Sequence, residues 1–377
     1  MSRLDAIIVG CGAMGSSISY HMAKRGLKTL TLEKFFLNHP YGSSHGDSRM
    51  LSALFFKHPA TYKLVRRAHE LWLELQKEAN VELIRMTGYL GVATEESELT
   101  EFARTPGKYS SDGWEYEVLS AKEIKEMFSV LQPADSQKGL LERKGGILFP
   151  EKCVEVHVKQ AEIDGAEFRF NEPVVSWNAD TNGVVVETAK DRYRADKIIF
   201  SAGGWTTGLL GDLNLPLKCE RQVFLKFMPL KNKEMFSPER LPGFIWLDKE
   251  PFGYAVPDFG TGVKAGVHHG GDIESSPDNI RRDVTSLDEL TVREFLKKYA
   301  PLANGPLTYS TTCMYTNTPD HQYLIDFHPD NKNVIIVSPC SGVGFCASSA
   351  IGEVVTEMAN FGKTTIDISG FGLSRFC

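Results

Sequence analysis

A glycine-rich turn near the N-terminus constrains the fold of this chain more than any other feature. Residues Asp5–Val9 form a short apolar segment typical of a strand, and a Gly-x-Gly-x-x-Gly motif follows at once, with Gly10, Gly12 and Gly15. In this motif the first glycine allows a tight turn, the second lets the backbone approach a pyrophosphate, and the third lets a helix pack on the strand. The pattern predicts a helix over residues 13–25, with a dinucleotide bound at its N-terminus, where free N–H groups face the phosphates.

A second strand and an acidic residue complete the expected dinucleotide-binding unit. Lys28–Leu32 has the pattern of a strand and ends in Glu33, which is placed to accept a hydrogen bond from a ribose hydroxyl. A glycine motif alone is weak evidence, and a simple packing turn is the alternative. Here the strand, helix, second strand and acid come in the expected order.

Three apolar runs predict neighbouring strands of one parallel sheet. They are Ala6–Val9, Lys197–Ser201 and Asn333–Val337, each nearly continuous, as in strands buried on both faces. Small residues follow each run, and ligands collect at the carboxyl ends of such strands. We therefore expect three distant parts of the chain to meet at one cofactor.

The segments between these strands predict a second, inserted domain. Residues 85–145 look helical and charged, at Glu96–Arg104 and Ser120–Met127, while residues 216–308 are rich in aromatic residues and alternating patterns. The expected fold class is α/β, with a Rossmann-like dinucleotide-binding domain of the glutathione-reductase type and an inserted α+β substrate domain that contains an antiparallel sheet. The boundaries that we expect are 1–84, 146–215 and 309–377 for the discontinuous cofactor domain, and 85–145 and 216–308 for the substrate domain.

Composition narrows the class of protein. The net charge of −6 gives no basic footprint for nucleic acid or for an anionic membrane, and no apolar run approaches the roughly 18 residues that span a bilayer. The chain starts with its dinucleotide strand, so we expect no leader peptide, and Ser374–Cys377 is not a Ser-Lys-Leu peroxisomal signal. Seven cysteines without close spacing predict reduced thiols, and no metal motif is present. We expect a soluble cytoplasmic protein without a metal.

A predicted hairpin carries the first candidate side chains for chemistry. Residues alternate along Gly262–His269, so Lys264 and His268 share one face of a strand. Phe252–Val256 would pair with it through a short Pro-Asp-Phe-Gly turn and place Tyr254 nearby. These side chains could line a site, although the same pattern fits an ordinary solvent-facing hairpin.

Three further segments could contribute to a site. In the loop Gly42–Arg49, the guanidinium of Arg49 could stabilise negative charge on a bound cofactor, although plain surface is the alternative. Cys313 lies in a stretch that looks irregular, where a cysteine is usually a small buried apolar side chain. The segment Pro339–Ser349 enters a helix that is expected to run to about Asn360, and its first turn would aim N–H groups at an anion.

Together these segments resemble the monomeric sarcosine oxidase and N-methyltryptophan oxidase family of flavoproteins over essentially the whole chain. The resemblance rests on Gly10-x-Gly12-x-x-Gly15, Gly42–Arg49, Ala202-Gly203-Gly204-Trp205, Gly262-Val263-Lys264 with His268, Cys313–Thr316 through Leu324-Ile325-Asp326, and Ser341-Gly342-x-Gly344-Phe345. It implies a monomer with FAD in a two-domain fold and with substrate held over the flavin by an antiparallel sheet. It also implies oxidation of a secondary or N-methyl amine to an imine, which water hydrolyses, while dioxygen becomes hydrogen peroxide.

The resemblance also implies roles for individual residues. Cys313 matches the cysteine whose sulfur bonds the flavin 8α carbon, and Lys264 matches the lysine at which oxygen is activated, where an ammonium stabilises a superoxide-like anion. Arg49 and His45 match cations beside the flavin. The expected catalytic residues are Lys264, Arg49, His45, Tyr254, His268 and Tyr315, the last three around the substrate. The expected cofactor-binding residues are Gly10, Gly12, Gly15, Glu33, Ser43, Ser44, Ser48, Arg49, Ala202, Gly203, Trp205, Cys313, Gly342, Gly344, Phe345 and Cys346.

The sequence departs from the family where the substrate carboxylate is bound. The family has an arginine three residues after the motif arginine and a lysine after Gly-Phe, and here these positions are Ser52 and Cys346, while Val343 replaces a histidine. Charge-assisted hydrogen bonds contribute roughly 1.5–3 kcal/mol each, so their loss should weaken carboxylate binding strongly unless His268, His269 or an arginine of the inserted domain replaces them. We expect an amine substrate that is not a simple N-methyl α-amino acid. A dehydrogenase that passes electrons to a carrier, and an idle flavin-binding homologue, are the alternatives.

Overall fold

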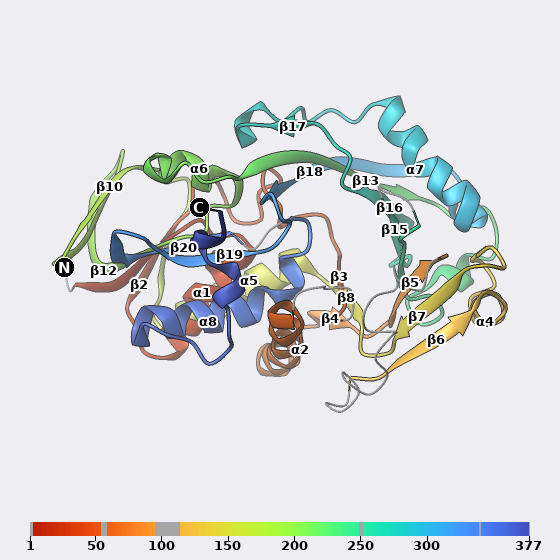
Figure 1. Cartoon of the computed structure of the whole chain (residues 1–377), viewed down its shortest axis with the longest axis horizontal. Helices are drawn as coiled ribbons and strands as arrows, with labels where there is room; N and C mark the ends of the chain where they lie inside the picture. Colours follow the sequence, from red (N-terminus) through yellow and green to blue (C-terminus); the bar gives the residue numbers. More distant parts are fainter. Residues whose placement is uncertain (1–2, 54–58, 95–113, 249–251, 339–340, 377) are drawn as a thin grey trace.

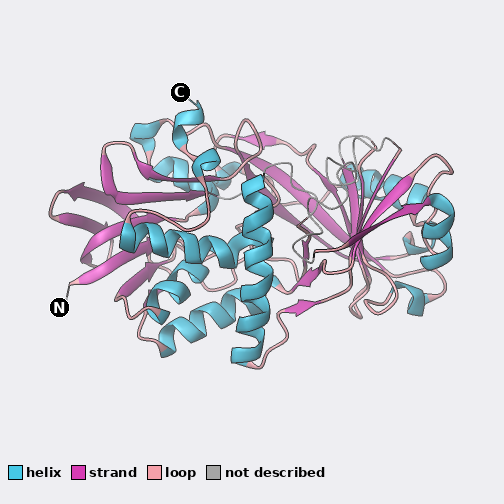
Figure 2. Ribbon diagram, turned by 60° about the horizontal axis from the view of Figure 1, so that its bottom comes forward, coloured by secondary structure: helices cyan, strands magenta, loops and turns pink. Residues whose placement is uncertain are grey.

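Two large sheets organise the molecule, one in each half (Figures 1 and 2). The computed structural model describes residues 3–53, 59–94, 114–248, 252–338 and 341–376. Within these residues, the sheet of the first half has eight strands and that of the second half has nine. Figure 2 shows most helices gathered around the first sheet, whereas strands dominate the other half.

The first sheet has a parallel centre. β1 (Leu4–Val9) lies between β2 (Thr29–Leu32) and β12 (Arg192–Phe200), while β9 (Glu167–Arg169) extends the sheet beyond β2 and β20 (Asn331–Ser338) pairs with β12. The antiparallel strands β10 (Val174–Asp180), β11 (Gly183–Thr188) and β19 (Leu324–His328) complete it. The prediction that three distant apolar runs form one parallel sheet is therefore confirmed, and their carboxyl ends lie along one edge.

Helices cover this sheet because their apolar faces pack on it and on one another. α1 (Ala13–Lys24) contacts both α5 (Pro150–Ile163) and α8 (Ser348–Phe361), and α2 (Pro59–Ala79) packs against α8 (Figure 1). α1 ends within one residue of the predicted end, two residues before Gly26, whose φ of 77° suits a helix end. The short helix α6 (Thr206–Leu209) follows β12.

The second sheet is mostly antiparallel, and its strands come from three parts of the chain. They are β5 (Tyr89–Ala93), β6 (Tyr116–Ser120), β7 (Lys138–Glu142), β13 (Lys218–Phe227), β14 (Gly243–Trp246), β15 (Phe252–Val256), β16 (Val263–His268), β17 (Ile273–Glu274) and β18 (Leu307–Asn317). The predicted hairpin is β15–β16, with Tyr254 opposite Gly266. α4 (Ala121–Met127) packs on β6 and β7, and α7 (Ser286–Tyr299) on β13 and β16.

The fold class is confirmed, because a Rossmann-like sheet with its helices adjoins a sheet-based second half. A small sheet of β3 (Arg49–Leu51), β4 (Ile84–Arg85) and β8 (Gly146–Leu148) lies near the middle of the molecule (Figure 1).

One sequence expectation is wrong and another is incomplete. Cys313 does not lie in an irregular stretch but inside β18, which pairs with β13 of the second sheet along its length. Within residues 85–145, the helix expected at Ser120–Met127 is confirmed as α4, and the described residues also contain the strands β5, β6 and β7, which the sequence did not predict. Glu96–Arg104 lies outside the described residues.

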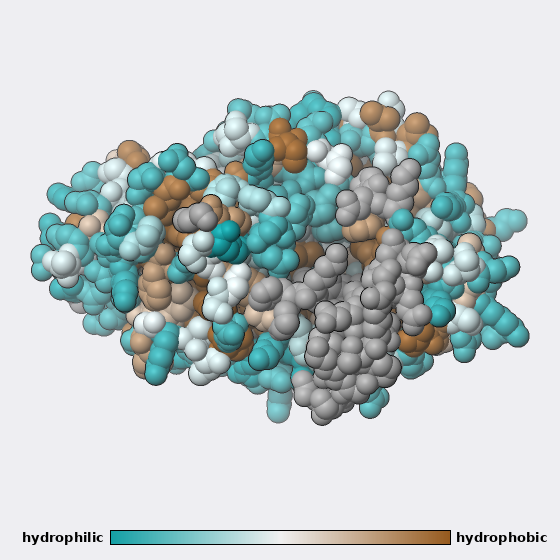
Figure 3. All heavy atoms as spheres, viewed as in Figure 1, coloured by the Kyte–Doolittle hydropathy of each residue, from teal (hydrophilic) through white to brown (hydrophobic). Residues whose placement is uncertain are grey.

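The surface in Figure 3 is largely hydrophilic, with apolar side chains in separate spots. Among the described residues, no helix combines the length and apolar character needed to cross a membrane.

Candidate active site

A cavity of about 950 Å³ is lined by residues of both large sheets. Most of the residues that the sequence predicts for the site line this cavity, and every predicted segment contributes at least one. These are Gly10, Gly12, Glu33, Ser43, Ser44, Ser48, Arg49, Ala202, Gly203, Trp205, Tyr254, Lys264, His268, Cys313, Tyr315, Gly342, Gly344, Phe345 and Cys346. Two predicted residues, Gly15 and His45, are not among the lining residues.

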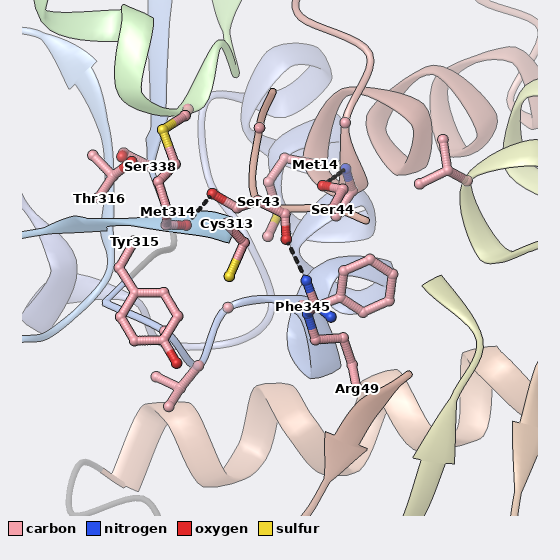
Figure 4. A pocket seen from close by; sticks show the side chains of 18 of the residues that line it. Met14, Ser43, Ser44, Arg49, Cys313, Met314, Tyr315, Thr316, Ser338 and Phe345 are labelled. Carbon is pink, nitrogen blue, oxygen red and sulfur yellow. Dashed lines mark hydrogen bonds between the residues drawn. The ribbon is translucent and has the colours of Figure 1, made fainter. Parts of the chain in front are cut away.

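The glycine turn has the shape that a bound pyrophosphate requires. Gly10 has a φ of 97°, and a Cβ on Gly15 would come within 1.7 Å of the Gly10 carbonyl oxygen, so Gly15 acts in the packing of helix on strand. A Cβ on Gly12 would instead meet only the Ser44 hydroxyl, at 3.1 Å, and would extend over the cavity wall. The Ser44 Oγ accepts a hydrogen bond from the Ala13 N–H at 3.0 Å (Figure 4). The residues present therefore fit a dinucleotide at the N-terminus of α1.

Glu33 lies at the same end of the cavity. Its carboxylate accepts hydrogen bonds from the N–H groups of Cys11 at 2.7 Å and Phe35 at 2.9 Å. Burial raises the pKa of Glu33, and these backbone donors oppose the rise. His39, which the sequence reasoning missed, lies with its Nε2 3.5 Å from the Glu33 carboxylate and also lines the cavity.

The loop of residues 43–48 binds two cations of the cavity wall, Arg49 and Lys264. Arg49 donates to the backbone carbonyls of Ser43 and Ser48, each at 2.8 Å. Lys264 donates from Nζ to the carbonyl oxygens of Gly46 and Ser48, also each at 2.8 Å, and to the Ser48 hydroxyl at 3.2 Å. Burial and the nearby Arg49 lower the pKa of Lys264 well below its usual value. Its three oxygen acceptors match the three N–H groups of an ammonium and favour the charged form.

His45 is not the cation that the sequence suggested. Its side chain is buried, its Nε2 has no hydrogen-bond partner among the described residues, and its ring centroid lies 6.4 Å from that of Phe224. Burial, together with the charges of Arg49 and Lys264, lowers the pKa of His45 to about 3. The imidazole is therefore neutral near pH 7.

Cys313 points its sulfur into the cavity, between Tyr315 and Arg49 in Figure 4. Its strand β18 places it directly opposite Gln222 of β13. Burial raises the pKa of the thiol, while Arg49, Lys264 and two further arginines oppose the rise. The cysteine thus lies buried among cations, which favour a thiolate at the moment of reaction.

Three aromatic side chains of the second sheet form the opposite wall. His268 Nδ1 and the Tyr315 hydroxyl are 3.0 Å apart, and burial lowers the pKa of His268 to about 3. Tyr254 lies across from Gly266, where a Cβ would come within 2.6 Å of the phenol oxygen. A Cβ on Gly342 would likewise come within 2.6 Å of His268 and Tyr315, so this glycine lets the loop approach the pair.

Ser52 and Cys346 lie at another part of the wall, and both are buried. The Ser52 hydroxyl donates to the carboxylate of Glu142, which also accepts from the Ala53 N–H at 2.9 Å and from the Trp114 indole N–H at 2.5 Å. Glu142 is fully buried. The sequence reasoning missed it, because its only local signal is a lone acid at the end of an apolar strand.

The described residues contain no group of histidine, cysteine or acidic side chains that could hold a metal ion. Their cysteines are free thiols, namely Cys11, Cys153, Cys219, Cys313 and Cys346.

Known proteins share both the sequence and the fold of this chain. The model of the DAO family, FAD dependent oxidoreductase, matches residues 5–358. A monomeric sarcosine oxidase of Bacillus sp. (strain NS-129) is 34% identical, covering 99% of this chain and 97% of its own, and an N-methyl-L-tryptophan oxidase of Citrobacter koseri is 30% identical, covering 99% of both. Among solved structures, NikD, an unusual amino acid oxidase, matches with a TM-score of 0.85 at 20% identity over 99% of this chain and 98% of its own.

The residues matched by the family model include every motif from Gly10 to Phe345 that the sequence analysis identified. The resemblance inferred from the sequence is confirmed, and the chain belongs to the DAO family of FAD-dependent oxidoreductases.

Proposed function

We propose that the protein oxidises a secondary or N-methyl amine to an imine, which water hydrolyses to an aldehyde and an amine, and that dioxygen takes up the electrons as hydrogen peroxide. The observation that carries this proposal is the buried Lys264, held by two backbone carbonyls in the wall of the cavity near Cys313. A buried ammonium is the group that oxygen reduction needs, because negative charge develops on oxygen.

FAD supplies a two-electron acceptor when it is bound. We infer that Gly12 and the N-terminus of α1 hold its pyrophosphate, that Glu33 binds its ribose, and that the turn at Gly342–Phe345 approaches its ring. Lys264 and Arg49 place positive charge along the same wall. Tyr254, with His268 and Tyr315, closes the cavity over the substrate and excludes water.

We further propose that FAD is covalently bound through the Cys313 sulfur. The support is the position of this thiol, buried in the cavity wall and surrounded by Arg49, Lys264 and other cations. Acid precipitation of the wild-type protein should leave the yellow colour in the pellet, and Cys313→Ala should release free FAD. Cys346→Ala is the matched control, because Cys346 is also a buried thiol of the cavity wall. Free FAD in the wild-type supernatant would reject the covalent bond.

The substrate is proposed not to be a simple N-methyl α-amino acid. The support is that Ser52 and Cys346 carry no charge, and that no arginine of the inserted domain is among the described lining residues. His268 is neutral because its pKa is about 3. His269 bonds to Glu220 at 2.8 Å and does not line the cavity. Nor does Arg221, which pairs with Asp288 at 2.8 Å.

A peroxide assay across secondary amines tests the function. Stoichiometric peroxide with bleaching of the flavin absorbance supports an oxidase. Bleaching that is reversed only by an added electron acceptor indicates a dehydrogenase, and absence of bleaching with every amine indicates an idle homologue.

A further inference from the structure

We propose that the Ser52 end of the cavity selects an amine substrate that carries a second ammonium group, and this inference rests on the proposed amine oxidation. The end is formed by Ser52, Tyr89 and Cys346, with Glu142 directly behind Ser52. We call it the acceptor end.

A fixed negative charge underlies the acceptor end. Glu142 of β7 lies opposite Tyr89 of β5, so the two side chains project to the same face of the sheet, and Tyr89 lines the cavity. Ser52, Ala53 and Trp114 each donate a hydrogen bond to the carboxylate of Glu142. Donors directed at a carboxylate stabilise its ionised form. A buried carboxylate therefore lies one side chain away from the ligand space.

Ser52 and Cys346 direct their hydrogens toward protein acceptors. The hydroxyl hydrogen of Ser52 is donated to Glu142, so toward a ligand its oxygen can only accept. The Cys346 thiol likewise donates to the Val343 carbonyl at 3.3 Å. A carboxylate, which only accepts, would face acceptors here, whereas an ammonium offers up to three donors.

The negative charge of Glu142 acts on side chains from separate elements. Burial is the largest cause of the raised pKa of Tyr89, and the charge of Glu142 is the second. It also contributes to the raised pKa of Cys346, which reaches about 12. Asp248, whose carboxylate accepts a hydrogen bond from the Gln137 amide, is itself one of the described lining residues. Arg49 and Lys264 direct their donors to the carbonyls of the 43–48 loop.

A matched substrate series tests the proposal. The series is N-methylbutylamine, N-methyl-1,4-diaminobutane and 4-(methylamino)butanoate, which present the same reacting amine and end in a methyl, an ammonium or a carboxylate. We expect kcat/KM for the diamine to exceed that for the monoamine by about tenfold or more, a difference of ~1.4 kcal/mol, and the acid to be the poorest. A diamine no better than the monoamine, or an acid that equals it, would overturn the proposal.

Variants at Glu142 and Ser52 test whether these residues cause the preference for the diamine. Glu142→Gln removes the negative charge, so the ratio of kcat/KM for the diamine to kcat/KM for the monoamine should fall toward one. Ser52→Ala should lower the same ratio, whereas Ser52→Thr, which keeps the hydroxyl, should leave it near the wild-type value. Glu357→Gln is the matched control, because Glu357 also accepts several hydrogen bonds but lies at the end of α8, away from the cavity. The ratio is taken on one sample, so partial misfolding does not alter it.

Anaerobic titration separates this inference from the proposed function. Ligand binding perturbs the flavin absorbance, while oxidation of the amine bleaches it. Absence of bleaching with all three compounds would reject amine oxidation. Tighter binding of the acid than of the diamine, read from the perturbation, would reject the acceptor end whatever the catalytic outcome.

Discussion

Neighbouring lysines on paired strands show how one residue can differ from its neighbour in function. Lys264 of β16 lies directly opposite Lys226 of β13. Lys264 donates to backbone carbonyls in the cavity wall, whereas Lys226 forms an ion pair with Asp47 and does not line the cavity. Of these two lysines, Lys264 is therefore the one in the cavity wall, where the proposed reaction with oxygen takes place.

We predict that Lys264→Met slows reoxidation of the reduced protein by about a hundredfold or more, the scale of losing one electrostatic stabiliser. Stopped-flow mixing of the dithionite-reduced protein with oxygen measures this step apart from amine oxidation. Lys226→Met serves as the control and should reoxidise at the wild-type rate. Unchanged reoxidation of Lys264→Met would remove the lysine from this role.

The charge at Glu142 alters how carboxylate binding can be restored. A single Ser52→Arg change would place a guanidinium beside Glu142, which would form an ion pair with it. We therefore predict that Ser52→Arg with Cys346→Lys raises kcat/KM on sarcosine only slightly. Addition of Glu142→Gln should raise it further by about tenfold to a hundredfold, the effect of one charge-assisted hydrogen bond. Equal sarcosine activity with and without Glu142→Gln would contradict this account.

Most site residues could be predicted because their motifs are local in sequence. The local sequence is enough to predict the conformation of the glycine turn, the position of the 42–49 loop and the alternating faces of β16. Glu142 could not be predicted in this way, since its role depends on the pairing of β7 with β5 and on contact with Ser52, 90 positions away. The neutral state of His45 also could not be predicted, because it results from tertiary burial beside Lys264.

At the scale of elements, the turn between β1 and α1 depends on Gly15, which packs the helix on the strand and does not line the cavity. A Cβ on Gly15 would overlap the Gly10 carbonyl oxygen at 1.7 Å, so the helix would have to move off the strand. Such overpacking costs typically 1–3 kcal/mol, and here it would also displace the helix N-terminus.

We predict that Gly15→Ala lowers both the free energy of unfolding and the FAD content of the purified protein. Gly211→Ala is the control, because a Cβ there meets nothing within 4 Å and the backbone has an ordinary φ. Denaturant unfolding and the ratio of flavin to protein absorbance provide the measurements. A Gly15→Ala protein with full flavin content and wild-type stability would contradict the packing role.

Element type was harder to predict than element position for two segments. β18 carries threonines and a serine around Cys313, so its sequence is as polar as that of an irregular segment. It forms a strand because β13 pairs with it along its length. Within residues 85–145 the sequence predicts the helix α4 but not the neighbouring strands, in which β6 exposes Glu117 whereas Glu142 of β7 is fully buried. Strand formation in both cases depends on partners that are distant in sequence.

At the scale of the whole molecule, the cavity exists because β13 and β18 run from one half of the protein toward the other (Figure 1). These strands place Cys313 and Tyr315 of the second sheet against the carboxyl ends of β1, β12 and β20. Stability of the helical layer beneath the first sheet therefore maintains the site, and this layer contains the buried histidines His21 and His157.

His21 of α1 and His157 of α5 lie in that layer beside Tyr20, whose ring centroid is 5.0 Å from His21 and 5.3 Å from His157. Burial lowers the pKa of His21 to about 3, with further lowering by Arg25 and Lys24, and burial lowers that of His157 well below its usual value. A histidine whose pKa is depressed in the folded state contributes stability that is fully present above the unfolded pKa of about 6.5 and is lost as pH falls below it.

We predict that the free energy of unfolding decreases between pH 7.5 and pH 5, by about 2 kcal/mol for His21 at pH 5 and a comparable amount for His157. The ordinary carboxylates titrate at lower pH, and Glu33, with its raised pKa, acts in the opposite sense. Urea unfolding of the holoprotein at each pH measures the slope. The double variant His21→Asn with His157→Asn should make the slope shallower, since neither side chain can then take up a proton on unfolding, while the buried His45 and His268 still do so. His321→Asn, at an exposed histidine, should retain the wild-type slope. A double variant with an unchanged slope would assign the acid sensitivity to other groups.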